Sequence, residues 1–116
     1  MKKLFEDMLD RLSRVPGVRG AMIVDAQAGV PIVEEMAEGV AGGAVAAMAA
    51  SLVKRSAKAA TTAKFGELRA IQLEAAAGHL IIASHRDVVA VAVTRVDAQL
   101  GLVRVEMRNV LEALKR

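Results

Sequence analysis

Hydrophobic side chains near the two ends of the chain recur at the spacing of one face of an α-helix. At the start of the chain these positions are Leu4, Phe5, Met8, Leu9, Leu12 and Val15. Near its end they are Leu100, Val103, Met107, Val110, Leu111 and Leu114. On the polar side of the first stripe, Asp7 and Asp10 precede Arg11 and Arg14 by one helical turn, so opposite charges would attract there. The pattern therefore predicts an amphipathic helix at each end of the chain.

Shorter apolar runs between these two helices are typical of β-strands. They cover residues 18–25, 30–34, 67–75, 80–84 and 88–93. The runs 80–84 and 88–93 are dense in apolar and β-branched residues, so they are predicted to lie in the middle of a sheet. Residues 67–75 alternate between polar and apolar, which is typical of a half-buried strand. Pro31 has no N–H for a strand ladder, so the run 30–34 is predicted at an edge of the sheet.

Residues 39–62 form an alanine-rich stretch, and no charged side chain occurs between residues 39 and 53. Alanine has the highest helix propensity, so we expect a helix here. Because residues 39–53 have no polar side, we predict that this part of the helix is buried all round. One side is expected to rest on the sheet through Val45, Met48, Leu52 and Val53.

The other side of this middle helix presents small residues, which allow another backbone to approach closely. They are Gly39, Gly43, Ala46, Ala47 and Ala50. A chain of 116 residues has little left to cover that side, so we predict that a second copy of the helix covers it. The predicted interface of this homodimer contains Gly43, Ala46, Ala47 and Ala50. The alternative is a helix that is covered entirely by its own chain.

The elements follow one another as helix, two strands, helix, three strands and helix. Strands that are apolar on both faces require a covering layer on each side. We therefore predict one three-layer α/β (α+β) domain covering residues 1–116. The first and last helices are expected on one face of the sheet and the middle helix on the other.

The composition narrows the possible partners and compartments. The chain has no cysteine, so disulfides and thiolate metal sites are excluded, and the cytoplasm is the expected location. The start of the chain lacks the continuous apolar stretch of a secretory signal, and no run is long enough to insert into a membrane. The net charge of +3 is spread along the chain, and Phe5 and Phe65 are the only aromatic residues, so nucleic-acid binding is not expected. An acidic protein surface is the favoured partner.

The sequence contains no constellation that indicates catalysis, a metal or a cofactor. His79 and His85 would lie about 20 Å apart on an extended strand, too far for one metal site, and each is interpreted as a surface histidine. The serines lack a nucleophile motif, and residues 39–43 lack the side chains of a phosphate loop. We therefore predict that the protein is not an enzyme and has no small-molecule substrate. The carboxylates before the middle helix are interpreted as complementing its dipole; they are Glu34, Glu35 and Glu38.

A series of short motifs runs along nearly the whole chain. They are Val15-Pro16-Gly17-Val18, Gly20-Ala21 running into Ile23-Val24-Asp25, Gly29-Val30-Pro31-Ile32, the alanine-rich helix, Phe65-Gly66-Glu67-Leu68, Gly78-His79-Leu80 and Leu100-Gly101-Leu102-Val103-Arg104. In order and spacing this series resembles the Roadblock family, also called the dynein light chain roadblock type, whose bacterial members accompany Ras-like GTPases. None of the motifs is catalytic. The chain differs from the family in having few acidic residues in the middle helix.

The resemblance implies a Roadblock/profilin-like fold with a five-stranded antiparallel sheet in the order 2-1-5-4-3. The Pro31 strand and the strand of residues 67–75 are then the two edges of the sheet. The resemblance also implies a homodimer in which the two copies of the 67–75 strand join into one continuous sheet and the two middle helices pack together. Arg69, Ile71 and Leu73 are therefore expected at the dimer interface as well.

Members of the family act as scaffolds, motor adaptors or regulators of a Ras-like GTPase, and some promote hydrolysis by repositioning the GTPase's own catalytic groups. The resemblance implies a non-catalytic homodimeric regulator of such a GTPase, without an arginine finger. The alternative is a structural adaptor, like a dynein light chain, with no effect on nucleotide state. Lys54, Arg55 and Lys58 are the candidate GTPase-binding residues. A simpler interpretation is that these cations only solvate the helix end and complement its dipole.

Overall fold

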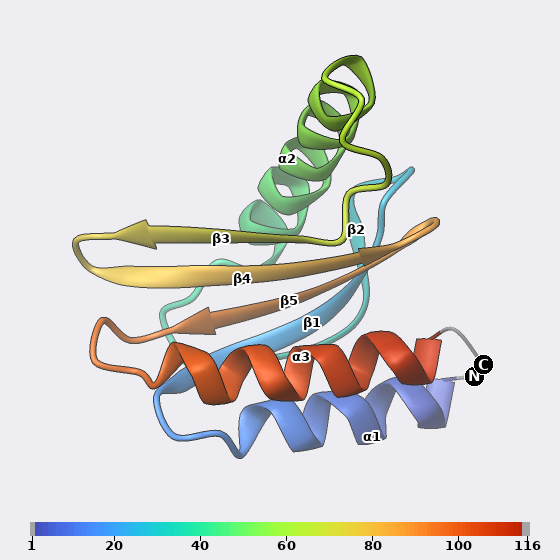
Figure 1. The fold of residues 1–116 in the computed structure, drawn as a ribbon. Coiled ribbons are helices and arrows are strands. Elements are labelled where there is room, and N and C mark those ends of the chain that lie inside the picture. The colour runs from blue at the N-terminus through green and yellow to red at the C-terminus, as the bar shows by residue number, and fades with distance from the viewer. Residues whose placement is uncertain (1, 115–116) are drawn as a thin grey trace.

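The computed structural model describes residues 2–114, and Figure 1 shows their fold. In chain order the elements are α1 (Lys2–Ser13), β1 (Val18–Asp25), β2 (Val30–Met36), α2 (Gly42–Thr62), β3 (Ala70–Ala75), β4 (Gly78–His85), β5 (Val88–Thr94) and α3 (Leu100–Leu114). The five strands form an antiparallel sheet in the order β2-β1-β5-β4-β3. α1 and α3 lie side by side on one face of the sheet, and α2 lies on the other (Figure 1). The predicted three-layer architecture and strand order are confirmed.

Two apolar cores hold the three layers together, one on each face of the sheet. The core beneath α1 and α3 includes Leu12, Ile23 and Val103, whose side chains are fully buried. The core beneath α2 takes the alternate residues of β1, Met22 and Val24, because successive side chains of a strand point to opposite faces. β1 and β5 contribute to both cores, which explains why the middle of each strand is apolar at every position.

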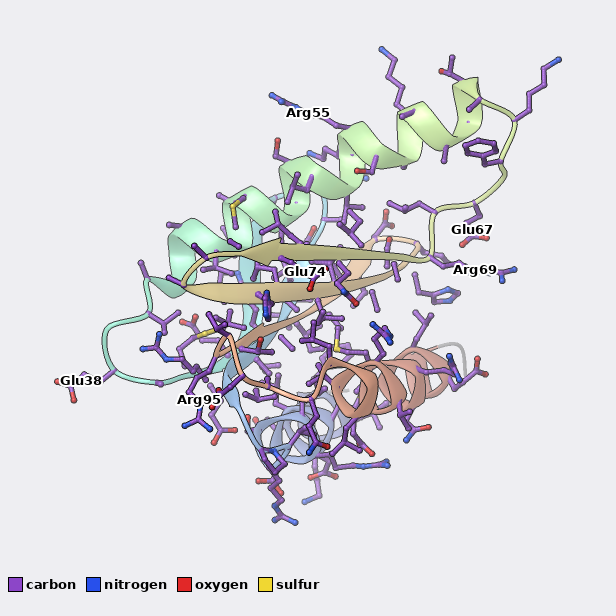
Figure 2. All side chains as sticks on the ribbon, turned by 60° about the vertical axis from the view of Figure 1, so that its left-hand side comes forward. Glu38, Arg55, Glu67, Arg69, Glu74 and Arg95 are labelled. Carbon is purple, nitrogen blue, oxygen red and sulfur yellow. The ribbon has the colours of Figure 1, made fainter. Side chains whose placement is uncertain are left out.

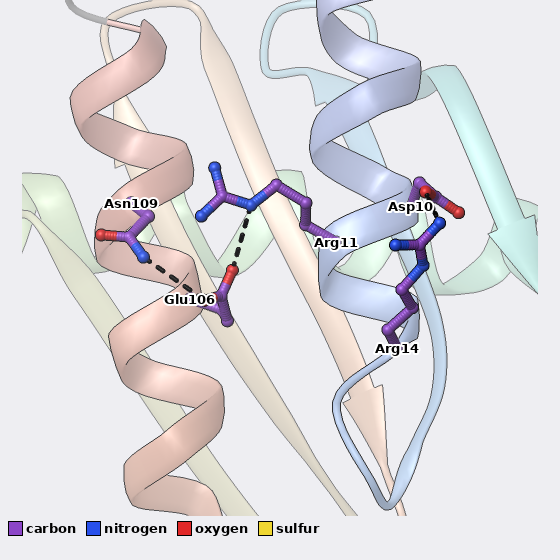
Figure 3. Close-up of polar contacts among 5 residues, drawn as sticks. All are labelled: Asp10, Arg11, Arg14, Glu106 and Asn109. Atoms are coloured by element: carbon purple, nitrogen blue, oxygen red, sulfur yellow. Dashed lines mark hydrogen bonds and ion pairs between the residues drawn. The ribbon is translucent and has the colours of Figure 1, made fainter.

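One ion pair links α1 to α3, and further polar contacts lie within each of the two helix regions (Figure 3). The predicted pair between Asp10 and Arg14 forms, with 2.7 Å between Arg14 Nη2 and Asp10 Oδ2. The spacing predicted a pair between Arg11 and Asp7, and this prediction is wrong. The Nε of Arg11 lies instead 3.5 Å from Oε2 of Glu106 on α3. The adjacent helix therefore supplies a carboxylate that the sequence of α1 does not indicate. Exposed ion pairs contribute only about 0–1 kcal/mol each, so the cores hold the layers together.

Several element boundaries differ from the predicted ones. β2 continues to Met36, and β3 begins at Ala70 rather than at residue 67. α2 begins at Gly42, because the chain must first cross from the edge strand β2 to the other face of the sheet. Gly39 lies in this crossing with a φ of +89°, a left-handed conformation that glycine adopts readily. Gly39 is therefore not part of the small-residue surface of the helix.

The glutamates that precede α2 differ in their positions. Glu34 lies on β2, and its carboxylate is so close to Gly42 that a Cβ on this glycine would overlap it. Among the described residues, no side chain caps the start of α2 through a hydrogen bond. A carboxylate beside the first turn still interacts favourably with the helix dipole, so Glu34 alone fits the prediction. It is wrong for Glu35, whose carboxylate accepts a 3.4 Å hydrogen bond from the Ser13 hydroxyl on the α1 side. It is also wrong for Glu38, which extends from the crossing into solvent (Figure 2).

Hydrogen exchange provides a test of the sheet order. β5 lies between β1 and β4, and its central residues are fully buried, so the amides of residues 89–93 are expected to exchange among the slowest. β2 pairs only with β1, and the register is irregular where Pro31 faces Val24, so the amides next to Pro31 are expected to exchange faster. Native-state exchange followed by NMR measures both groups. The reverse ranking would contradict the sheet order.

Candidate interaction surface on the middle helix

The side of α2 that packs on the sheet is built mainly from small residues. Its buried positions are Ala46, Ala49, Ala50 and Val53. Among the residues predicted to rest on the sheet, Val45, Leu52 and Val53 are at least half-buried. Met48 is 42% exposed, so the prediction is wrong for this residue. The strands already bring large side chains to this core, and alanine on the helix fills the remaining space.

The opposite side of α2 faces solvent, and its N-terminal half carries no charge. Its exposed residues are Gly43, Ala44, Ala47, Met48 and Ser51. Of the predicted interface residues on this helix, Gly43 and Ala47 therefore have surface available to a partner. Ala46 and Ala50 are only 0% and 3% exposed, because Ala46 packs on the sheet and Ala50 lies against Gly29 in the turn between β1 and β2. These two alanines have no surface left for a second chain, so the small-residue surface is narrower than predicted.

The C-terminal half of the same side is basic. Lys54, Arg55 and Lys58 are all exposed, and Figure 2 shows Arg55 extended away from the sheet. Lys54 Nζ donates a 3.4 Å hydrogen bond to the carbonyl oxygen of Gln27, which is a neutral partner. In the part of the chain that the structure describes, none of the three cations forms an ion pair. The three candidate cations thus lie together in the C-terminal half of the helix, before its last turn, with their charge unneutralised.

The chain holds Phe65 in solvent just beyond α2. The N–H of Phe65 donates to the Ala60 carbonyl (2.8 Å) and the N–H of Lys64 donates to the Thr61 carbonyl (3.0 Å), which are the two bonds of a Schellman motif. Lys64 has the positive φ, 64°, that this motif requires. The motif fixes the backbone of Phe65, yet the side chain is 84% exposed. A large apolar side chain held in water at a basic helix end is a candidate contact for a partner protein.

The sequence-based candidates did not include Phe65. The end of α2 extends past the edge of the sheet (Figure 1), so Phe65 packs on neither core, and the chain returns to the core beneath α2 only at Leu68. The signal in the sequence was weak but present, because Phe65 belongs to none of the hydrophobic stripes and comes directly after Lys64. Lys64 precedes the ring directly, and Glu67 follows it two residues later.

The edge strand β3 lies beside this surface. Ile71 and Leu73 are half-buried on the α2 face of the sheet, and the exposed Arg69 immediately precedes the strand. The Arg69 carbonyl accepts the N–H of Ser84 on β4. Hydrogen-bonded residues alternate along an antiparallel pair, so Ile71 and Leu73 also bond to β4. The backbone groups that face the free edge are those of Ala70, Gln72 and Glu74.

In the part of the chain that the structure describes, neither histidine belongs to a group of metal ligands. Within residues 2–114, no three His, Asp or Glu side chains are grouped as metal ligands would be. His79 is 9% exposed, and its Nε2 lies 3.1 Å from the Val96 carbonyl oxygen, so the interpretation as a surface histidine is wrong. The segment after β5 covers it. His85 is half-buried at the end of β4. No helix in the described range is long and apolar enough to cross a membrane.

Solved structures share the fold closely. A Roadblock/LC7 domain from Streptomyces avermitilis superposes with a TM-score of 0.81 at 15% identity, covering 99% of this chain and 94% of the other. MglB of Myxococcus xanthus gives a TM-score of 0.87 at 21% identity, with 97% and 86% covered. The gliding protein MglB from Thermus thermophilus gives 0.85 at 18% identity, with 97% and 87% covered. At these identities the likeness establishes the fold alone.

Sequence comparison identifies the family. No curated protein sequence matches the chain. The family profile described as the Roadblock/LC7 domain does match it, over residues 4–94. This match extends from α1 to the end of β5 and therefore includes every strand of the sheet. Because it covers well over half of the chain, the protein belongs to the Roadblock/LC7 family.

Proposed function

We propose that the protein is a homodimeric, non-catalytic regulator that binds a Ras-like small GTPase. The observation that carries the proposal is the solvent side of α2, which is uncharged over its N-terminal half and basic over its C-terminal half. Membership of the Roadblock/LC7 family supports a GTPase as the class of partner, since bacterial Roadblock proteins accompany Ras-like GTPases. The two halves of the helix surface suit two different contacts, the first with a second copy and the second with the GTPase.

The dimer is proposed to form through two adjoining surfaces. The first is the uncharged side of α2, where Met48 is 42% exposed and the small residues let a second helix approach closely. The second is the free edge of β3, whose unpaired backbone groups can add an antiparallel strand. A two-fold axis satisfies both contacts at once, because each patch then meets its own copy. In this dimer Ile71 and Leu73 lie on the face of the joined sheet that the α2 helices cover, and Arg69, which immediately precedes β3, lies next to the joined edge.

The basic end of α2 is proposed to hold the GTPase. Lys54, Arg55 and Lys58 are exposed, and the dimer presents this cluster in two copies. Ras-like GTPases have acidic residues in and near their switch regions, so opposite charges steer the encounter. Phe65 lies beyond the end of α2, on the C-terminal side of these cations, and supplies an apolar contact that cations alone do not. One GTPase across the two-fold axis blocks the second cluster, which gives a complex of two subunits with one GTPase.

In this proposal the protein supplies no catalytic group of its own. Stimulation of hydrolysis arises from repositioning the catalytic groups of the GTPase, and no arginine finger is invoked. A structural adaptor without effect on nucleotide state would use the same dimer and the same basic surface. Single-turnover GTP hydrolysis by the GTPase, measured with and without the protein, separates these functions. A regulator changes the rate constant, whereas an adaptor leaves it unchanged.

Charge reversal tests the basic surface. In the triple variant Lys54→Glu, Arg55→Glu and Lys58→Glu, association with a Ras-like small GTPase that the wild type binds is expected to slow by about ten- to a hundredfold at low salt. Most of the salt dependence of association should disappear, while the dimer stays intact. Stopped-flow measurements at several ionic strengths give the association rate constant, and light scattering gives the mass of the dimer.

The matched control reverses three exposed cations in or next to α1 and β1, which are Lys3, Arg14 and Arg19. It changes the net charge by the same amount as the triple variant on α2, and its association rate constant is expected to stay close to that of the wild type. Equal slowing by both triple variants would mean that net charge, rather than the α2 surface, steers the GTPase. Unchanged association in both would move the contact to another surface of the dimer.

A further inference from the structure

A groove of about 600 Å³ lies between β3 and α3, on the face of the sheet opposite α2. It arises because α3 packs over β4 and β5 and does not extend over the edge strand β3 (Figure 1). Ala70 and Gln72 of β3 are the cross-strand partners of Ala83 and Ile81, which belong to the core beneath α3. Cross-strand partners share a face, so Ala70 and Gln72 point to the α3 side. No helix covers them there, and both are exposed.

Most of the surface inside this groove is apolar. The floor and walls are formed by Ile81 and Ala83 of β4, Met107 and Leu111 of α3 and Ala70 of β3. Leu111 is half-buried and Ala70 is exposed, so both remain accessible to an incoming side chain. The volume falls in the range of about 300–1,000 Å³ in which proteins bind small ligands. An apolar side chain that enters the groove removes its own surface and that of Leu111 from water, which favours binding.

Three arginines surround this apolar space. Arg104 and Arg108 stand one turn apart on α3, and Arg69 lies where β3 begins, extended into solvent (Figure 2). Arg104 Nη1 donates a hydrogen bond across the groove to Oε1 of Gln72, an uncharged acceptor. Over residues 2–114, the guanidinium groups of Arg69 and Arg108 have neither a hydrogen-bond nor an ion-pair partner. Glu112 is the one acid among the lining residues and already has an interaction of its own, so positive charge dominates the groove.

We propose that this groove binds an acidic segment of a partner protein. An apolar side chain of that segment packs on the floor of the groove, and its carboxylates pair with the arginines. A carboxylate is a stronger partner for Arg104 than the Gln72 amide, because hydrogen bonds between ionised groups are stronger and often bidentate. Arg104 and Arg108 are on one face of α3, so two carboxylates one turn apart on a helical segment match their spacing. Binding of the segment thus replaces the neutral hydrogen bond between Arg104 and Gln72 with ion pairs, and it covers the apolar floor of the groove.

The groove lies apart from the surfaces proposed to bind the GTPase and the second copy of the chain. Lys54, Arg55 and Lys58 lie on α2, which covers the opposite face of the sheet, so the GTPase and the acidic segment do not compete directly. Pairing of two copies through β3 uses the backbone edge, whereas the groove uses the face beneath Ala70 and Gln72. The apolar floor is recessed between a strand and a helix. A protruding side chain reaches it, and the flat surface of a membrane does not.

Selection from a random peptide library displayed on phage, with the full-length protein as bait, tests this proposal. The enriched peptides are expected to carry net negative charge and at least one large apolar residue. A synthetic copy of the most enriched peptide is then titrated into the isotope-labelled protein. The amides of residues 70–72, 81–83 and 104–111 are expected to shift on binding, whereas those of α2 are not.

The double variant Arg104→Glu and Arg108→Glu is expected to bind this peptide at least about tenfold more weakly, because attraction becomes repulsion. The matched control, Lys3→Glu with Arg19→Glu, reverses exposed charges outside the groove and is expected to bind like the wild type. Circular dichroism checks the fold of both variants. The proposal is overturned by enrichment of neutral or basic peptides, by shifts confined to other residues, or by equal weakening in both variants. Binding to phosphatidylserine vesicles that depends on Arg104 and Arg108, with no peptide enriched, also overturns it.

Discussion

Ala47→Glu is expected to separate the proposed dimer into monomers that keep their fold. Ala47 is exposed on the uncharged side of α2, so a longer side chain has access to water in the monomer. In the dimer this position faces the helix of the second copy, and the two-fold axis buries the new carboxylate on both chains. A buried charge without a partner costs about 3–5 kcal/mol. The dissociation constant of the dimer should therefore rise by about a hundredfold or more.

Two further variants make this result specific. Val105→Glu adds the same charge at an exposed position of α3, on the other face of the sheet, and is expected to remain dimeric. Ala50→Glu adds it at a residue that is 3% exposed within its own chain, so it is expected to unfold each subunit. Sedimentation velocity gives the mass and circular dichroism the fold. A folded Ala47→Glu protein with an unchanged dissociation constant would place the dimer contact away from α2.

The sheet was largely predictable because its signals are local. Pro31 lacks an N–H in any context, so the strand that contains it was expected at an edge, and β2 is an edge strand. β5 is apolar on both faces, which only a strand between two covering layers permits. The order of the strands did not follow from these patterns. It followed from the family resemblance, since a strand's own sequence does not specify its neighbours.

The orientation of α2 was not predictable in the same way. Hydrophobic size favoured Met48 over Ala46 as a contact with the sheet. In the structure the strands already fill this core with Met22, Val24 and Val91, all fully buried, and the space that remains accepts alanine. Close packing depends on two complementary surfaces, and the pattern along one helix describes only one of them.

Some candidate sites were likewise predictable from local sequence, and others depend on the tertiary structure. Lys54, Arg55 and Lys58 were identifiable because the change from uncharged to basic residues is visible along the chain. The exposure of Phe65 depends on where the end of α2 leaves the sheet, which is a tertiary property. The groove was not predicted at all, because its opposite sides come from β3 and α3. These elements are distant in sequence and meet only in the folded sheet and its covering layer.

Gln72→Pro is expected to weaken the dimer through β3 while leaving the ladder between β3 and β4 in place. The Arg69 carbonyl bonds to β4, so the N–H of Gln72, an odd number of residues further on, faces the free edge. Proline removes this donor and leaves a carbonyl of the second copy unsatisfied, at a cost of about 1–3 kcal/mol. The two-fold axis repeats the loss on the other chain. The dissociation constant should therefore rise by at least about tenfold.

Two comparisons separate the backbone effect from other effects of the substitution. Gln72→Ala removes the same side chain, including its hydrogen bond from Arg104, but keeps the N–H, and is expected to dimerise like the wild type. Leu73→Pro removes an N–H that bonds to β4, so it is expected to lower the stability of each subunit instead. If Gln72→Pro dimerises as tightly as Gln72→Ala, the free edge of β3 is outside the interface. Should Ala47→Glu still dissociate the dimer in that case, the α2 helices alone join the two copies.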